Sequence, residues 1–145
     1  MGGLIREDKG KWVTGFRRNL NYATSSTAVE CRAIREGLKL ALDRNSKGIL
    51  VETDSFLSDK HVLNNIICDR RSMLSRLDSE VKHIYREGNS CADLLASLKF
   101  QQQSLVVLPT MPPCMGQAMY DDASGKKFLR RLILFGSIFC KLLLI

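Results

Sequence analysis

The sequence lacks the long apolar runs that secretory signals and membrane spans require. Residues 1–8 contain no apolar stretch long enough for a signal peptide. Residues 128–145 are mostly apolar, but Lys141 interrupts them and the longest uncharged run, 132–140, has nine residues. A spanning helix needs roughly 20. We interpret this tail as an atypical appendage or a buried helix rather than a membrane anchor, and we expect an intracellular protein, nuclear or cytoplasmic.

Histidine is scarce and the cysteines are scattered, which argues against a zinc site. The five cysteines stand at positions 31, 68, 91, 114 and 140, and no pair has the two-residue spacing of a zinc knuckle. Only His61 and His83 could supplement them. An odd number of widely separated cysteines indicates reduced thiols rather than a disulfide framework.

Acidic residues are outnumbered, yet the charge is a weak argument for a nucleic-acid partner. The net charge is +7, but the last 22 residues contribute +5 and the remainder only +2. Charge therefore permits a phosphate-bearing partner without requiring one. A length of 145 residues, 45% of them hydrophobic and 26% charged, is typical of one globular domain.

Hydrophobic periodicity and turn residues predict a mixed α/β fold. The chain begins with a hairpin of strands 3–6 and 11–16, and a further strand must cover its open edge. A helix over 28–42 follows, with Thr27 and Glu30 at capping-box spacing. The solid apolar run 49–51 indicates a strand buried on both faces. The remaining expected elements are helices at 58–67 and 70–77, a strand at 80–86, a helix at 91–98 capped by Asn89, and an edge strand at 105–108.

Three acids stand at positions where an unpaired charge would be energetically unfavourable. Glu30 shares a helical face with Ile34 and Ala41, Asp54 ends the buried strand, and Asp93 lies in the first turn of the last helix. If these elements converge, the carboxylates repel one another unless a divalent cation lies between them. Oxygen ligands without His or Cys favour Mg²⁺ or Mn²⁺, and such a cluster suits two-metal phosphodiester hydrolysis.

Each of these residues also has a purely structural interpretation. Glu30 could complete the capping box with Thr27, Asp54 could be a polar strand end that opens a loop, and Asp93 could be a first-turn acid that the helix dipole favours. We expect His83 to be a half-buried structural histidine on its strand, and His61 to lie on a helix surface. Lys82 and Arg86 could contact phosphate or simply solvate a strand face.

Several segments together resemble the plant ribonuclease H-like domain, of the type 1 ribonuclease H family. The similarity covers roughly residues 2–98. The matching segments are 2–6 with 8–12 (GGLIR, DKGKW), 28–33 with 37–41 (AVECRA, GLKLA), 51–55 (VETDS) and 83–96 (HIYREGNSCADLLA). The Arg-Glu-x-Asn-x-x-Ala-Asp string, joined to an upstream strand that ends in Asp-Ser, is the most specific part.

The resemblance implies a five-stranded mixed sheet with helices on both faces. It also implies that the domain binds nucleic acid. In that family two Mg²⁺ ions cleave the RNA strand of RNA–DNA hybrids. Glu30, Asp54 and Asp93 match three of the four metal-binding acids of that family. The fourth acid stands on the family's first strand, ahead of a glycine pair like Gly2-Gly3. The chain begins at this pair, so we expect the first strand and its Asp to be missing and the hairpin edge to be exposed.

The resemblance also divides the chain. We expect a ribonuclease H-like domain over 1–100, a variable extension over 101–125, and a basic, apolar tail over 126–145. Two alternatives to a hybrid ribonuclease stay open. One is a non-catalytic module that binds nucleic acid or protein, and the other is an inactive fragment.

Overall fold

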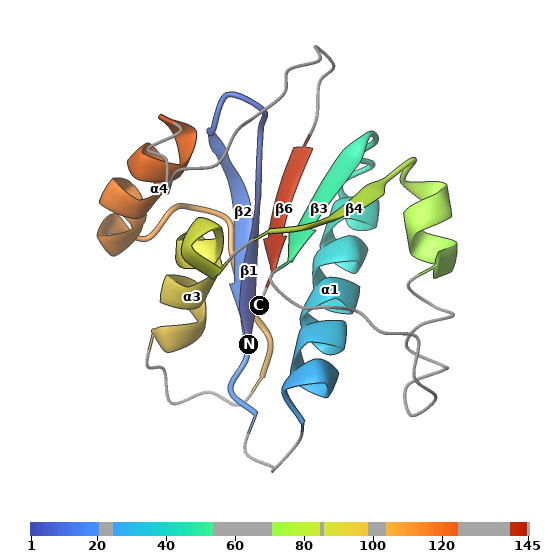
Figure 1. Ribbon diagram of the computed structural model, residues 1–145, viewed down its shortest axis with the longest axis horizontal. Helices are drawn as coiled ribbons and strands as arrows, with labels where there is room; N and C mark the ends of the chain where they lie inside the picture. The colour runs from blue at the N-terminus through green and yellow to red at the C-terminus, as the bar shows by residue number, and fades with distance from the viewer. Residues whose placement is uncertain (21–24, 54–70, 85, 99–103, 125–139, 145) are drawn as a thin grey trace.

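The predicted hairpin lies within a six-stranded mixed sheet of the order β4-β3-β6-β1-β2-β5 (Figure 1). This computed structural model describes residues 1–20, 25–53, 71–84, 86–98, 104–124 and 140–144. The strands are β1 (Gly2–Arg6), β2 (Trp12–Arg17), β3 (Ile49–Thr53), β4 (Glu80–His83), β5 (Val106–Leu108) and β6 (Cys140–Leu144). The helices are α1 (Ser26–Asp43), η1 (Arg86–Asn89), α3 (Ser90–Ser97), η2 (Pro113–Met115) and α4 (Gly116–Ala123), and residues 71–76 are also helical. The predicted mixed α/β class is confirmed.

The hairpin forms where the sequence predicts it. Strands β1 and β2 pair antiparallel, and Gly10 closes the turn with a φ of 81°, a backbone conformation that favours glycine. Gly2 allows α3 to approach closely, because a Cβ atom at this position would lie 2.8 Å from the backbone nitrogen of Ala96. The glycines therefore fix both the turn and the distance between β1 and α3.

The open edge of the hairpin is covered from the other end of the chain. Strand β6 lies between β1 and β3, antiparallel to β1 and parallel to β3 (Figure 1). The prediction of an exposed hairpin edge is therefore wrong for this structure. The interpretation of the tail as a helix is also wrong for residues 140–144, which form a strand because two strand edges are available to pair with them. Residues 125–139 lie outside the described part of the chain.

The first helix begins earlier than predicted. Ser25 is the N-cap of α1, and its hydroxyl accepts a hydrogen bond of 3.3 Å from the backbone N–H of Ala28. Thr27 lies inside the helix, so the predicted capping box of Thr27 and Glu30 is wrong. Ser25 takes the role because its backbone is extended, as a cap residue requires.

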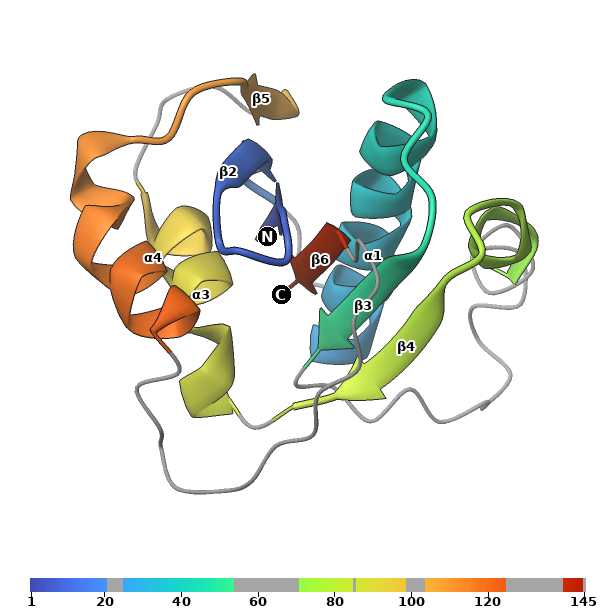
Figure 2. The same cartoon turned by 90° about the horizontal axis from the view of Figure 1, so that it is seen from above.

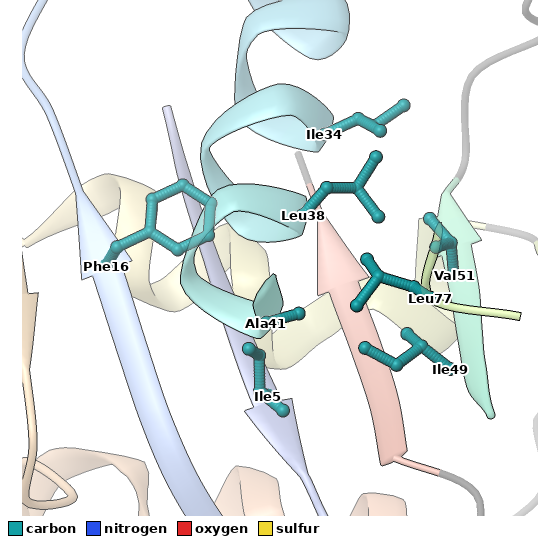
Figure 3. Packing of buried hydrophobic residues seen from close by; sticks show 8 residues of the cluster. All are labelled: Ile5, Phe16, Ile34, Leu38, Ala41, Ile49, Val51 and Leu77. Atoms are coloured by element: carbon teal, nitrogen blue, oxygen red, sulfur yellow. The ribbon is translucent and has the colours of Figure 1, made fainter. Parts of the chain in front are cut away.

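Two apolar clusters lie on the two faces of the sheet (Figure 2). On one face, α1 packs Ile34, Leu38 and Ala41 against strands β1, β2 and β3 (Figure 3). On the opposite face, α3 and α4 cover Leu4 of β1. Ile49 and Val51 of β3 are buried in the cluster on the α1 face, but Leu50 between them is half-buried and belongs to neither cluster, so the predicted burial of both faces of this strand is confirmed only in part.

The segment 105–124 packs onto the same sheet. The predicted edge strand is confirmed as β5, which pairs antiparallel with β2 and accepts a hydrogen bond of 3.3 Å from the Thr14 hydroxyl at the Leu108 carbonyl. Met115 and Met119 are buried in the cluster beneath α3 and α4. No helix in the described ranges is long and apolar enough to cross a membrane.

Strand β4 forms the other edge of the sheet, parallel to β3. All four of its residues are exposed, His83 among them, so the prediction of a half-buried histidine is wrong. The alternating pattern indicated a strand correctly, but it did not indicate that neither face of this short edge strand would be covered. The predicted helix at 58–67, with His61, lies outside the described residues.

Candidate functional site

The carboxyl end of β3 is the part of the sheet where a ligand site is expected. Strands β4 and β6 both run parallel to β3, so the three strands end at the same edge. Ligand sites in open α/β sheets form at such an edge. The last residue of β3, Thr53, is buried and is in register with His83 of β4 and Leu144 of β6. Asp54 follows Thr53 directly in the sequence and lies outside the described residues.

Glu30 reaches the site region from α1. It stands in the second turn of this helix and is half-buried, next to the apolar face formed by Ile34, Gly37 and Ala41. These three residues are buried, as the helical spacing predicts. Glu30 therefore lies at the margin of the buried face rather than at its centre, where its carboxylate can keep contact with water.

Asp93 comes from the opposite face of the sheet. It stands in the first turn of α3, is half-buried and has an interaction partner in the structure. The positive end of the helix dipole favours an acid here. Asn89 occupies the N-cap position as predicted and is fully buried, but its side chain makes no capping hydrogen bond.

Helices α1 and α3, which carry Glu30 and Asp93, lie on opposite faces of the sheet. In both views the first turns of α1 lie beside the carboxyl end of β3, and α3 lies across the sheet from α1 (Figures 1 and 2). Strand β6 contacts both helices. Among the described residues, no group of at least three His, Cys, Asp or Glu side chains is close enough to hold a metal ion. Asp54, the third acid, stands outside this search.

The chemistry of the available donors fits a hard divalent cation. Glu30 and Asp93 offer carboxylate oxygens, the ligands that Mg²⁺ and Mn²⁺ prefer, and both are partly open to solvent. Strand β6 adds no acid, because residues 140–144 are Cys, Lys and three Leu. Among the described residues, Glu30 of α1 and Asp93 of α3 are the candidate acids that these two helices carry, and Asp54 lies outside the described part of the chain.

Glu52 is a buried acid to which we assigned no role from the sequence. It lies on β3 two residues before Asp54, is 7% exposed and has an interaction partner. An acid within a strand that is otherwise Ile, Leu, Val and Thr is the signal that could have identified it. Its carboxyl group is a further oxygen donor near the end of β3.

A second polar cluster lies on the α3 side of the sheet. Arg6 of β1 forms an ion pair with Asp122 of α4, with 2.7 Å between Nε and Oδ2, and both side chains are largely buried. The charges of Arg6 and Asp122 both act on the thiol of Cys91 in α3. Burial and the Asp122 carboxylate together raise the pKa of the Cys91 thiol to about 11. This cluster ties β1, α3 and α4 together, and no spacing in the sequence indicated it.

Comparison with known proteins assigns the family. A family model described as reverse transcriptase-like matches residues 1–99. The chain is 29% identical over 143 aligned residues to a protein of Arabidopsis thaliana with the name "Putative ribonuclease H protein". The alignment covers 90% of this chain and 23% of that protein, so the chain spans less than a quarter of its relative. No solved structure matches the chain. Since the family model covers more than half of the sequence, this chain belongs to the reverse transcriptase-like family, which is ribonuclease H-like.

Proposed function

We propose that this chain is a nucleic-acid-binding ribonuclease H-like domain that hydrolyses the RNA strand of RNA–DNA hybrids with Mg²⁺ or Mn²⁺. The observation that carries the proposal is the family match over residues 1–99, which includes all three candidate acids. The sheet supports it, because parallel strands β3 and β6 end together between α1 and α3. The name of the Arabidopsis relative points to the same activity.

In this proposal Glu30, Asp54 and Asp93 hold the metal ions and set their positions. Bound ions of this kind supply water activation and stabilise the leaving oxygen in phosphodiester hydrolysis. In this proposal the buried faces of α1 and α3 hold Glu30 and Asp93 in place, and Asp54 follows the last residue of β3 in the sequence. Lys82 on the exposed strand β4 can contact the backbone of the nucleic acid.

The test is cleavage of an RNA–DNA hybrid by the full chain with Mg²⁺. We expect Asp54→Asn to reduce cleavage at least about 100-fold, because the carboxylate is lost while the side-chain volume is kept. Glu30→Gln and Asp93→Asn should act in the same direction. The matched control is Asp43→Asn at the exposed end of α1, which should cleave as the unchanged chain does. Equal activity of Asp54→Asn and Asp43→Asn would remove the assigned site.

One observation favours a second candidate, a module that binds nucleic acid without cleaving it. The strand at the centre of the sheet, β6, brings no acid to the edge where β3 ends. Under this alternative the chain binds a hybrid with an affinity that falls steeply with salt, and Mg²⁺ produces no cleavage. Binding and cleavage measured on the same preparation distinguish the two functions.

A further inference from the structure

The segment that carries β5, η2 and the start of α4 differs from the rest of the chain in its charge. No residue from 100 to 120 is charged, although 26% of the residues in the whole chain are. A surface that binds nucleic acid needs Lys or Arg side chains to neutralise phosphates. The described part of this run, residues 104–120, therefore offers no cation to a nucleic-acid backbone, and its exposed surface suits a protein partner better.

Exposed apolar side chains are concentrated in the same segment. Four large hydrophobic residues are exposed in the part of the chain that the structure describes, and three of them, Val107, Met111 and Tyr120, lie here. The side chain of Met111 is 40% exposed and belongs to neither buried cluster. Met and Tyr are enriched at protein interfaces, and charged residues are depleted at their centres. The composition is thus that of a contact surface for another protein.

Two successive prolines fix the backbone next to Met111. A residue that precedes proline is restricted to extended or polyproline II conformations, and this restriction applies to Met111 and to Pro112. Pro112 has a φ of −60° and a ψ of 141°, which is close to polyproline II. The chain bends at residues 109 and 110, and Pro113 begins η2. The extended stretch is therefore short and covers residues 111–113.

The fold holds this stretch at both ends. Before it, Leu108 of β5 pairs with Gly15, and its carbonyl accepts the hydrogen bond from the Thr14 hydroxyl. After it, Met115 is completely buried between α3 and α4, and its backbone N–H donates a hydrogen bond of 2.9 Å to the carbonyl of Pro112. A peptide that is already held in its bound conformation loses little conformational entropy when it binds.

We propose that residues 111–113 are a docking peptide for a protein partner with an aromatic-lined groove of the kind that binds polyproline II segments. Such grooves recognise extended, proline-containing peptides whose conformation is formed in advance. Met111 and Pro113 are exposed and can enter the groove, whereas Pro112 is half-buried and keeps them in position.

The docking peptide and the proposed nuclease site lie at opposite ends of the sheet. Strand β1 is antiparallel to β6, and β6 is parallel to β3. Strand β2 is antiparallel to β1, and β5 is antiparallel to β2, so β5 runs opposite to β3. The residues that follow β5 thus leave the sheet near the amino end of β3, where α4 also lies (Figure 1). A partner bound there leaves the carboxyl end of β3 accessible.

Binding of the full chain to a purified SH3 domain and a purified WW domain, measured by fluorescence anisotropy, tests the proposal. We expect saturable binding to at least one of them, and we expect Pro112→Ala and Met111→Ser to weaken it at least about tenfold. The matched control is Pro109→Ala, which removes a proline on the other side of the bend and should bind as the unaltered chain does. No binding to either domain, or equal losses in Pro109→Ala and Pro112→Ala, would overturn the proposal.

Two further measurements separate a docking role from a structural one. Circular dichroism checks the fold of each variant, and if Pro112→Ala unfolds the chain, exposed Met111 carries the comparison through Met111→Ser. A free peptide of residues 108–114, with Ser in place of Cys114, should bind the same domain at least about fivefold more weakly than the full chain, because nothing holds its ends. Equal affinity of peptide and chain would overturn the role of the fold.

Other occupants of this surface would give different results. A dimer of the chain that Met111→Ser dissociates would assign the surface to a second copy. Displacement of the bound domain by an RNA–DNA hybrid would assign the surface to nucleic acid. Either result would overturn the proposal. None of these measurements depends on nuclease activity, so the proposal stands or fails separately from the proposed function.

Discussion

At the scale of single residues, the ion pair of Arg6 and Asp122 connects β1 to α4. Burial raises the pKa of Asp122, and the Arg6 guanidinium lowers it and offsets part of that effect. The two residues are far apart in the sequence, and no pattern in the sequence connects them. Sequence patterns report local periodicity, so they do not reveal a pair of this kind, although they do single out Glu30, Asp54 and Asp93 as candidates.

We predict that Arg6→Met lowers the free energy of unfolding by about 3 kcal/mol near neutral pH, because it leaves the Asp122 carboxylate buried without its cation. Loss of Arg6 raises the pKa of Asp122 further, so the folded state holds the proton more tightly than the unfolded state does. Stability then falls as pH rises through the window between the unfolded and the folded pKa. Urea unfolding should therefore show a smaller loss at pH 4 than at pH 7.

The control for this prediction is the double variant Arg6→Met, Asp122→Leu, which removes both charges. It should recover most of the stability at neutral pH, because no uncompensated charge stays buried. A loss of equal size in the single and double variants at every pH would show that the pair contributes through packing alone.

A second prediction at this scale concerns the thiols. The raised pKa of Cys91, about 11, leaves roughly one thiol in 1,000 ionised at pH 8, and the side chain is buried. Cys114 is exposed. Iodoacetamide followed by peptide mass spectrometry should therefore label Cys114 in the native chain much faster than Cys91, with the urea-unfolded chain as the control. Equal labelling of the two native thiols would contradict the packing of α3 against α4.

At the scale of elements, local signals predicted most of the described structure. The hairpin turn, the apolar face of α1, the solid run of β3 and the edge strand β5 all follow from patterns within a few residues. The cap of α1 differs by two residues, because Thr27 and Glu30 have the right spacing but Ser25 has the extended backbone. Strand β6 could not be predicted, because its partners β1 and β3 are distant in sequence and a short apolar run fits a helix or a strand equally well.

The cap of α1 gives a prediction at this scale. Ser25→Ala removes the acceptor for the Ala28 N–H and should lower the free energy of unfolding by about 1 kcal/mol. Ser25→Asp, which keeps an acceptor, should retain stability in the same urea titration. The account of the cap would be contradicted if both variants lost the same stability.

At the scale of the whole molecule, the sheet extends beyond the residues that the family model matches. The reverse transcriptase-like match ends at residue 99, yet the described fold continues through β5 and α4 and is completed by β6. The sequence resemblance was sufficient to assign the family and to select three acids. It could not indicate what lies at the centre of the sheet, because the strand there comes from outside the matched residues.

The central claim is that Glu30, Asp54 and Asp93 act together as a divalent-metal site. The most direct measurement is Mn²⁺ binding, observed as loss of the free-ion signal in electron paramagnetic resonance. We predict that the unaltered chain binds Mn²⁺ and that each of Glu30→Gln, Asp54→Asn and Asp93→Asn weakens binding at least about tenfold. The Asp43→Asn control should bind as the unaltered chain does. Equal Mn²⁺ affinity in all of these proteins would contradict the claim.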